Sequence, residues 1–193
     1  MTRNIAIIGC GAIGYEITKS IDNESIPNGR VIALFDAERE KLDLLEKALT
    51  NKPDAIFDNF DDFITSAVFN KIDFVIEAAS IEAAQRYSVV LLEKGKDLMI
   101  MSTGSFSDSK FSKEILYHIR TSGRRVYLPS GAIGGADILR AVKDYVDDVV
   151  LITTKSINSI KGAPFFLSRG INPETIKTPT PIFDGTAEEA IKE

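Results

Sequence analysis

The residues best suited to bind a ligand form a glycine-rich segment near the N-terminus, Gly9–Gly14 (GCGAIG). Glycines at its first, third and sixth positions permit a tight turn, a close backbone approach to a pyrophosphate, and close packing of a helix on a strand. The apolar run 5–8 precedes this segment, and isoleucines follow it at helical spacing. A strand, a glycine turn and an amphipathic helix in this order predict that the helix N-terminus binds the phosphates of NAD or NADP. The cofactor-binding residues predicted from this segment are Gly9, Gly11, Ala12, Ile13 and Gly14.

An acidic residue, Asp36, directly follows the second apolar run, 31–35. It lies about 20 residues after the glycine segment, where a carboxylate accepts hydrogen bonds from the ribose hydroxyls of the adenosine half. A negative charge there repels a 2′-phosphate, so Asp36 favours NAD over NADP. Arg39 can weaken this preference if it reaches the ribose, although a solvated cation at the start of a helix is the simpler interpretation.

Small side chains follow two later apolar runs, 74–76 and 98–101. Ligands in open α/β sheets bind beyond the carboxyl ends of the strands, and small residues there leave room for a flat ring. We therefore expect the nicotinamide and its ribose to lie beside Ala78, Ala79, Ser80 and Ser102. Ordinary turn and helix-cap roles remain open for the two serines, because Ser80 also fits an N-cap position.

The elements that position these residues alternate between short apolar runs and helical patterns over residues 1–130. This alternation is typical of βαβ units, and it predicts an α/β fold with a doubly wound parallel Rossmann sheet. Residues 1–130 are accordingly predicted to form a dinucleotide-binding domain. The strands expected along it are 5–8, 31–35, 55–57, 74–76, 98–101 and 126–128.

The pattern changes after Pro129, and residues 131–193 are predicted to form an incomplete α+β domain for substrate binding and dimerisation. A glycine-rich loop beginning at Ser130 and Gly131 precedes a helix, so its backbone amides can bind a substrate carboxylate. Glycines that only serve the turn are the alternative. The β-branched run 149–154 predicts a strand. Lys155 follows this strand and can pair with a second carboxylate, although a solvated lysine is the alternative.

The last part of the chain combines an irregular segment with a helix start. Residues 156–185 contain several prolines and glycines, which favour an irregular conformation. Thr186 and Glu189 then form a capping-box pattern, which predicts a helix. Because this helix has room for only a few residues before Glu193, we expect the domain to be incomplete.

Composition and charge exclude several other classes of function. Hydrophobic residues make up 44% of the chain and the net charge is −5, so neither a nucleic acid nor an anionic membrane is expected as a partner. The single cysteine, Cys10, excludes an intramolecular disulfide and cysteine-cluster metal sites, and we expect no metal and no nucleophilic role for it. A cytoplasmic protein acting on a small molecule is predicted.

Five segments of the chain resemble the L-aspartate dehydrogenases. They are VIEAAS (75–80), MSTG (101–104), PSGAIGGAD (129–137), VVLITTK (149–155) and IFDGTA (182–187). The resemblance implies NAD(P)-dependent oxidation of L-aspartate to iminoaspartate, which hydrolyses to oxaloacetate and ammonia. It also implies a supply of iminoaspartate to NAD biosynthesis, a homodimer, and a cofactor contact at Ala132 near the nicotinamide.

One departure from the family concerns the catalytic residue. The family continues beyond its IFDGTA-like segment into a Phe-Pro-Ala-Asn-like stretch and a catalytic histidine, and neither occurs here. His118, the single histidine, borders an apolar helix stripe and cannot be matched to the family residue, so no catalytic residue is assigned. We expect the chain as given to be weakly active or inactive. The alternatives are a non-catalytic dinucleotide-binding module or a related two-domain oxidoreductase, such as a homoserine dehydrogenase or dihydrodipicolinate reductase.

Overall fold

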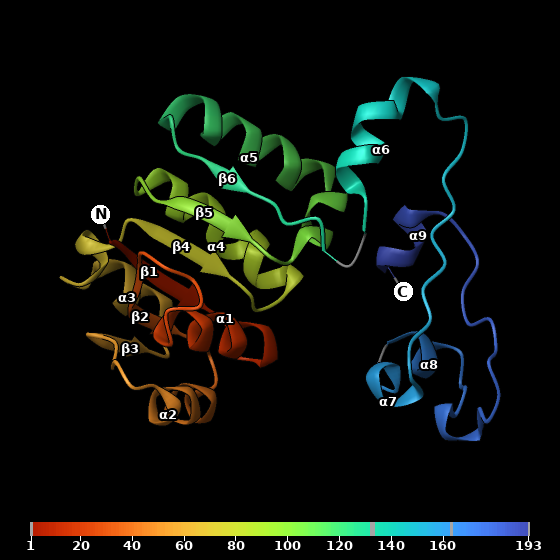
Figure 1. The fold of residues 1–193 in the computed structure, drawn as a ribbon, viewed down its shortest axis with the longest axis horizontal. Coiled ribbons are helices and arrows are strands. Elements are labelled where there is room, and N and C mark those ends of the chain that lie inside the picture. Colours follow the sequence, from red (N-terminus) through yellow and green to blue (C-terminus); the bar gives the residue numbers. More distant parts are fainter. Residues whose placement is uncertain (1, 132–133, 163, 193) are drawn as a thin grey trace. The chain divides into compact units, whose positions relative to one another are not determined.

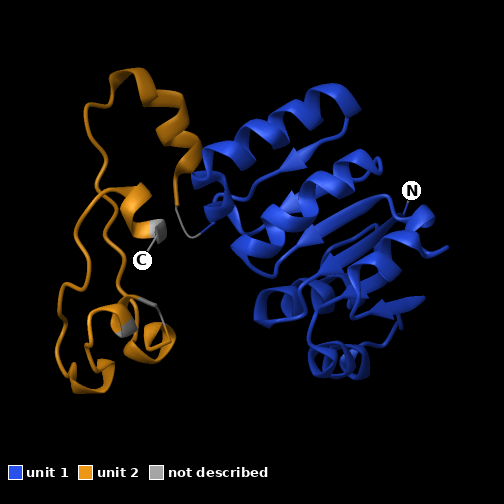
Figure 2. Cartoon of the chain, turned by 180° about the vertical axis from the view of Figure 1, so that it is seen from behind, with its two compact units in different colours: residues 1–132 blue, residues 133–193 orange. Residues whose placement is uncertain are grey.

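The computed structural model describes residues 2–131, 134–162 and 164–192. Contacts within the chain divide it into two compact units, residues 1–132 and 133–193 (Figure 2). The first unit contains the sheet and the glycine-rich segment.

The first unit is built on a six-stranded parallel sheet with the strand order β3-β2-β1-β4-β5-β6 (Figure 1). This order reverses between β1 and β4, which is the arrangement of a doubly wound nucleotide-binding sheet. The predicted parallel Rossmann fold is therefore confirmed. The strand bounds are β1 (Arg3–Ile8), β2 (Gly29–Phe35), β3 (Ala55–Phe57), β4 (Phe74–Glu77), β5 (Asp97–Ile100) and β6 (Val126–Tyr127).

Helices cover both faces of the sheet, which explains why its strands are continuous apolar runs. One face packs on α1 (Ala12–Asp22) and α2 (Arg39–Ala48), with Ile5 and Ile7 of β1 pointing into this cluster. The other face receives Ala6 and Ile8 of the same strand, because successive side chains of a strand point in opposite directions. It packs on α3 (Phe60–Thr65), α4 (Ile81–Glu93) and α5 (Ser109–Ser122), with the 3-10 turns η1 (Phe69–Lys71) and η2 (Thr103–Ser107) between the elements.

Polar side chains cap the N-termini of α3 and α4. Ser80 caps α4, as the sequence predicted, and its Oγ accepts a hydrogen bond from the backbone N–H of Ala83 at 3.1 Å. Asn59 caps α3 in the same way, by accepting from the N–H groups of Asp61 and Asp62. The helix α3 was absent from the sequence prediction, although Asn59 is a favourable N-cap residue.

The second unit contains short helical elements. They are α6 (Ala136–Val142), η3 (Lys143–Tyr145), α7 (Ile157–Ile160), α8 (Pro164–Ser168), η4 (Pro173–Thr175) and α9 (Ala187–Lys192). The capping box predicted at the last helix is present, because Thr186 N–H donates to Glu189 at 2.8 Å and Glu189 N–H donates to the Thr186 hydroxyl at 3.3 Å. The segment 156–185, which was predicted to be irregular, contains the short helical elements α7, α8 and η4.

The strand predicted at 149–154 is not formed, and this prediction was wrong. These residues have no assigned secondary structure, and the side chains from Val149 to Ile152 are 58–86% exposed. A strand needs a paired neighbour for its backbone hydrogen bonds, and the described part of the second unit has no other strand to provide one. β-Branched residues alone therefore do not make a strand here.

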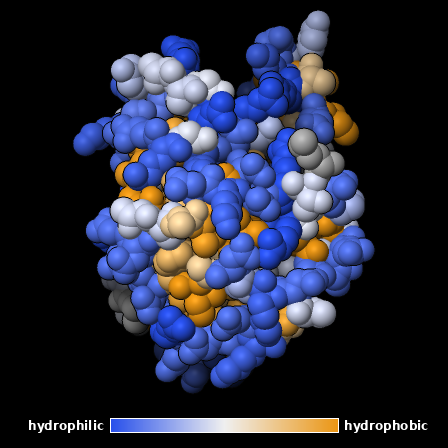
Figure 3. Space-filling view, turned by 90° about the vertical axis from the view of Figure 1, so that its left-hand side faces the viewer, coloured by the Kyte–Doolittle hydropathy of each residue, from blue (hydrophilic) through white to orange (hydrophobic). Residues whose placement is uncertain are grey.

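The surface is mainly polar on the side where the parallel strands begin. Figure 3 shows this side, where hydrophilic residues predominate and hydrophobic ones gather in small areas. In the described ranges, no helix has the length and apolar character needed to cross a membrane.

Candidate dinucleotide-binding site

The glycine turn after β1 has a conformation and surroundings that require glycine at two positions. Gly9 has a φ of +91°, and a Cβ built on it would lie 2.6 Å from the backbone of Ala79. A Cβ on Gly14 would overlap the carbonyl oxygen of Gly9. Since side chains rarely adopt this φ and cannot share the space of a backbone atom, both positions are restricted to glycine. The turn thereby brings α1 directly against the end of β1.

Gly11 differs from these two because it faces open space. No heavy atom lies within 4 Å of a Cβ built at this position. Gly11 is the N-cap of α1, and the first helical hydrogen bond runs from Tyr15 N–H to its carbonyl at 2.8 Å. The N–H groups of Ala12, Ile13 and Gly14 precede this bond and remain available at the positive end of the helix. An open space bounded by such amides fits a pyrophosphate.

Asp36 lies beside the glycine turn. Its Oδ2 accepts a hydrogen bond from Cys10 N–H at 2.7 Å, and its Oδ1 accepts from Glu38 N–H at 2.9 Å. Each carboxylate oxygen has more than one acceptor position, so both can still accept from a ribose hydroxyl. The half-buried carboxylate is thus fixed at the place where the sequence predicted the adenosine ribose.

A cavity of about 280 Å³ joins these groups at the carboxyl ends of β1, β2 and β4. This is where the strand order reverses, the position at which doubly wound sheets bind their ligands. The structure therefore brings together Gly9, Gly11, Asp36 and the segment 78–80, as predicted from the sequence. The other residues lining the cavity are Ile8, Phe35, Ala37, Glu38, Lys41, Ala83 and Tyr87.

Comparison with known proteins identifies the family. Residues 9–129 match a family model described as "Homoserine dehydrogenase, NAD binding domain", and residues 137–193 match "Aspartate dehydrogenase, C-terminal". The chain is 37% identical over 190 residues to the L-aspartate dehydrogenase of Methanocaldococcus jannaschii, covering 98% of this chain and 68% of that one. For the L-aspartate dehydrogenase of Nitrosopumilus maritimus the identity is 35%, covering 98% and 67%.

The chain belongs to the L-aspartate dehydrogenase family. It spans about two thirds of the length of the curated relatives it matches. The C-terminal match separates it from the homoserine dehydrogenases, with which it shares the NAD-binding domain model.

Solved structures show the same fold. An aspartate dehydrogenase from Thermotoga maritima has a TM-score of 0.55 at 24% identity, covering 90% of this chain and 72% of that one. The WlbA dehydrogenase from Bordetella pertussis, solved with NADH and UDP-GlcNAcA, has a TM-score of 0.57 at 13% identity, covering 66% and 35%.

Glu77 ends β4 in this member of the L-aspartate dehydrogenase family, and its carboxylate orients neighbouring backbone groups. It is 3% exposed, and its Oε1 accepts hydrogen bonds from Ala79 N–H and the Ser102 hydroxyl, each at 2.8 Å. Its Oε2 accepts from Ser102 N–H at 3.1 Å. One buried carboxylate therefore joins the ends of β4 and β5 next to the cavity. Ser102 contacts Glu77 and does not line the cavity.

Two side chains with potentially reactive groups, Cys10 and His118, do not line the cavity. Cys10 is buried, and this burial, together with the charge of Asp36, raises the pKa of its thiol to about 12. Because the thiolate is the reactive form, this shift disfavours a nucleophilic role for Cys10. His118 lies on α5 with its Nε2 3.6 Å from a carboxylate oxygen of Glu93, and it is not among the residues of the cavity.

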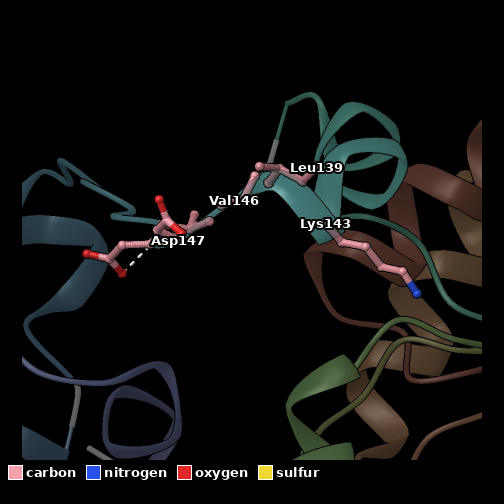
Figure 4. Close-up of a pocket in the computed structure, with 6 residues that line it drawn as sticks. Leu139, Lys143, Val146 and Asp147 are labelled. Atoms are coloured by element: carbon pink, nitrogen blue, oxygen red, sulfur yellow. Dashed lines mark hydrogen bonds between the residues drawn. The ribbon is translucent and has the colours of Figure 1, made fainter.

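The predicted substrate-binding residues lie outside this cavity. Ser130 and Gly131 follow β6 and are exposed, and Lys155 is exposed in the second unit, shortly before α7. Ala132 lies outside the described residues. The second unit has an open cavity of its own, of about 330 Å³, beside α6. None of the predicted substrate-binding residues lines this cavity. Figure 4 shows Lys143 extending away from Asp147. These two charged side chains therefore do not form a joint binding site.

Two polar side chains that line the candidate site, Lys41 and Tyr87, were not predicted from the sequence. Lys41 reaches the cavity from the first turn of α2, and Tyr87 reaches it from the middle of α4. A signal for Lys41 was present in the sequence: Glu38 stands three residues before it at the start of a helix, a spacing at which side chains meet.

Proposed function

We propose that this protein is an NAD(P)-dependent L-aspartate dehydrogenase, which oxidises L-aspartate to iminoaspartate. Iminoaspartate then hydrolyses to oxaloacetate and ammonia. Membership of the family supports the reaction. The observation that carries the cofactor assignment is the meeting of the open glycine turn and the Asp36 carboxylate in one cavity.

In this proposal, different residues of the first unit bind different parts of the cofactor. The amides of Gly11 to Gly14 bind the pyrophosphate, and Asp36 accepts hydrogen bonds from the adenosine ribose, which favours NAD over NADP. Ala78, Ala79 and Ser80 border the nicotinamide side of the cavity. The nicotinamide, when bound, takes up the hydride from the substrate carbon. Glu77 is a positioning residue, because it holds Ala79 and Ser102 through three hydrogen bonds.

The remaining assignments concern the substrate and the assembly. We assign residues 1–130 to cofactor binding and 131–193 to substrate binding and dimerisation. Backbone amides at Ser130 and Gly131 and the ammonium of Lys155 provide donors for the two carboxylates of aspartate. Ala132 is assigned to the cofactor near the nicotinamide. A homodimer is supported by the exposed apolar run Val149 to Ile152, since surfaces of this kind mark contact sites.

Substitution of Gly11 tests the cofactor site cleanly. Because a side chain at this position meets no neighbouring atom, Gly11→Val is expected to fold normally while its side chain occupies the space for the pyrophosphate. NADH fluorescence should then show saturable binding to the wild-type protein and at least about tenfold weaker binding to the variant.

Gly162→Val provides the matched control, since Gly162 also faces open space and lies in the second unit. It should bind NADH as the wild type does. Absence of NADH binding to the wild-type protein would refute the cofactor assignment.

The reaction itself is tested by L-aspartate-dependent reduction of NAD⁺ by the wild-type protein, with L-malate as the comparison substrate. Equal rates with both compounds would refute the substrate assignment.

A further inference from the structure

The ribose end of the cavity has one cationic lining residue, Lys41, among those that the structure describes. Its Nζ lies 2.6 Å from Oε1 of Glu38, which is the N-cap residue of α2 and also lines the cavity. Lys41 and Glu38 are both partly exposed, with side chains 42% and 67% accessible. Their ion pair is therefore open to exchange with a ligand that enters the cavity.

Arg39 does not take this position, although the sequence made it a candidate for contact with the ribose. Its Nε lies 3.0 Å from Oδ1 of Asp43, and its Nη1 lies 3.8 Å from Oδ2 of Asp58. It is not among the lining residues of the cavity. Arg39 is thus engaged by carboxylates outside the site, and Lys41 is the cation that faces it.

The charges around Lys41 keep it protonated. The hydrogen bond to Glu38 raises the pKa of the Lys41 ammonium, and the negative charge of Asp36 raises it further, whereas desolvation lowers it. A fixed positive charge next to two carboxylates leaves the ribose end of the site with a net negative charge. Such a site tolerates a ribose hydroxyl and resists a phosphate dianion, unless the ammonium is released to pair with it.

We propose that Lys41 is a second specificity-determining residue at the ribose 2′ position, beside Asp36, and that its ion pair with Glu38 limits the binding of NADP. With NAD, the 2′-hydroxyl donates to Asp36 and Lys41 stays with Glu38. With NADP, the 2′-phosphate must take Lys41 away from Glu38, because no other cation lines the described cavity. The proposal rests on the proposed dinucleotide site and concerns which of the two dinucleotides it prefers.

The test is a set of dissociation constants for NADH and NADPH, measured by nicotinamide fluorescence at two salt concentrations. Lys41→Met should weaken NADPH binding about tenfold, as expected for loss of a charged hydrogen bond, and change NADH binding less than about twofold. Lys41→Arg should keep NADPH binding. Glu38→Gln should tighten NADPH binding by about five- to tenfold, because Lys41 is then free to meet the phosphate.

Arg39→Met is the matched control, since it removes a cation from the same helix turn outside the cavity, and it should leave the NADPH-to-NADH ratio unchanged. The wild-type preference for NADH should also decrease as salt screens the carboxylates. Equal losses of NADH and NADPH binding in Lys41→Met would overturn the inference. So would wild-type affinities for both dinucleotides in Lys41→Met and Glu38→Gln. In either case NADH binding by the wild type would leave the cofactor site standing. No binding of NADH by the wild type would overturn both.

Discussion

At the scale of single residues, the function depends on how one carboxylate is held. Asp36 is fixed by two backbone N–H groups, from Cys10 and Glu38, on opposite oxygens. These bonds connect the glycine turn to the start of α2, so the residue proposed to bind the ribose also stabilises the turn proposed to bind the phosphates. A neutral replacement should therefore affect affinity and cofactor preference together.

We predict that Asp36→Asn weakens NADH binding about tenfold, because an amide keeps only one acceptor oxygen and loses the charge that the ribose hydroxyls and backbone amides favour. NADPH binding should decrease less, since the repulsion of the 2′-phosphate is also removed. Titration of both dinucleotides against the variant measures the two effects. Equal weakening of NADH and NADPH would contradict a discriminating role for Asp36, and thermal unfolding of the apoprotein controls for damage to the turn.

Cys10 provides a second prediction at this scale. Burial raises the pKa of its thiol from 9.0 to about 12, so the unfolded state loses the proton first as the pH increases. The contribution of the buried Cys10 thiol to the free energy of unfolding is complete below pH 9.0 and decreases as the pH approaches 12.

Iodoacetamide should alkylate the native protein at least about a hundredfold more slowly than the urea-unfolded protein at pH 8. Mass spectrometry of quenched samples measures this ratio, and similar rates in both states would show that the thiol is accessible.

At the scale of secondary-structure elements, the ends of parallel strands are joined by side chains as well as by the sheet. Glu77 ends β4, and its buried carboxylate accepts three hydrogen bonds from Ala79 and Ser102. Backbone bonds add to this connection, since Met101 N–H donates to the Glu77 carbonyl at 2.9 Å. The side of the cavity proposed to face the nicotinamide is therefore positioned by a buried carboxylate.

Replacing Glu77 by Gln should destabilise the first unit by about 1–3 kcal/mol, because one amide cannot accept all three hydrogen bonds and its NH₂ group then faces donors. The segments 78–80 and 102–104 should lose their fixed positions, so NADH binding should weaken as well. Ser102→Ala removes only the hydroxyl partner and should cost less. Urea unfolding and NADH titration of both variants test this order. A Glu77→Gln protein as stable as the wild type would contradict the positioning role.

The sequence predicted these elements well where the signal is local. Continuous apolar runs identified the strands of the sheet, and the glycine turn and Asp36, both predicted from local patterns, line one cavity. Lys41 was missed because its role depends on which way a side chain leaves α2. The strand expected at 149–154 failed for a different reason. Whether a β-branched segment forms a strand depends on a partner distant in sequence, or on another chain, which local propensity does not reveal.

At the scale of the whole molecule, the two units differ in how completely they bury their apolar side chains. The first unit has two clusters of buried residues, one on each face of the sheet. In the described part of the second unit, the buried large hydrophobic residues are Phe165 and Phe166. Tyr145 is 89% exposed and Ile152 is 86% exposed. The second unit therefore carries the apolar surface on which an assembly can form.

We predict that this surface mediates the proposed homodimer through the run from Val149 to Ile152. Pairing of this β-branched segment with its copy in a second chain would supply the backbone partners that the segment lacks in one chain. Ile152→Lys should then shift the protein towards the monomer, since the substitution places a charge in an apolar contact. Leu44→Lys is the control, because Leu44 is also exposed, at 66%, but lies on α2 in the first unit. Light scattering over a range of concentrations distinguishes the two. A wild-type monomer at all concentrations would refute the homodimer, whereas a dimer that Ile152→Lys leaves intact would place its interface elsewhere.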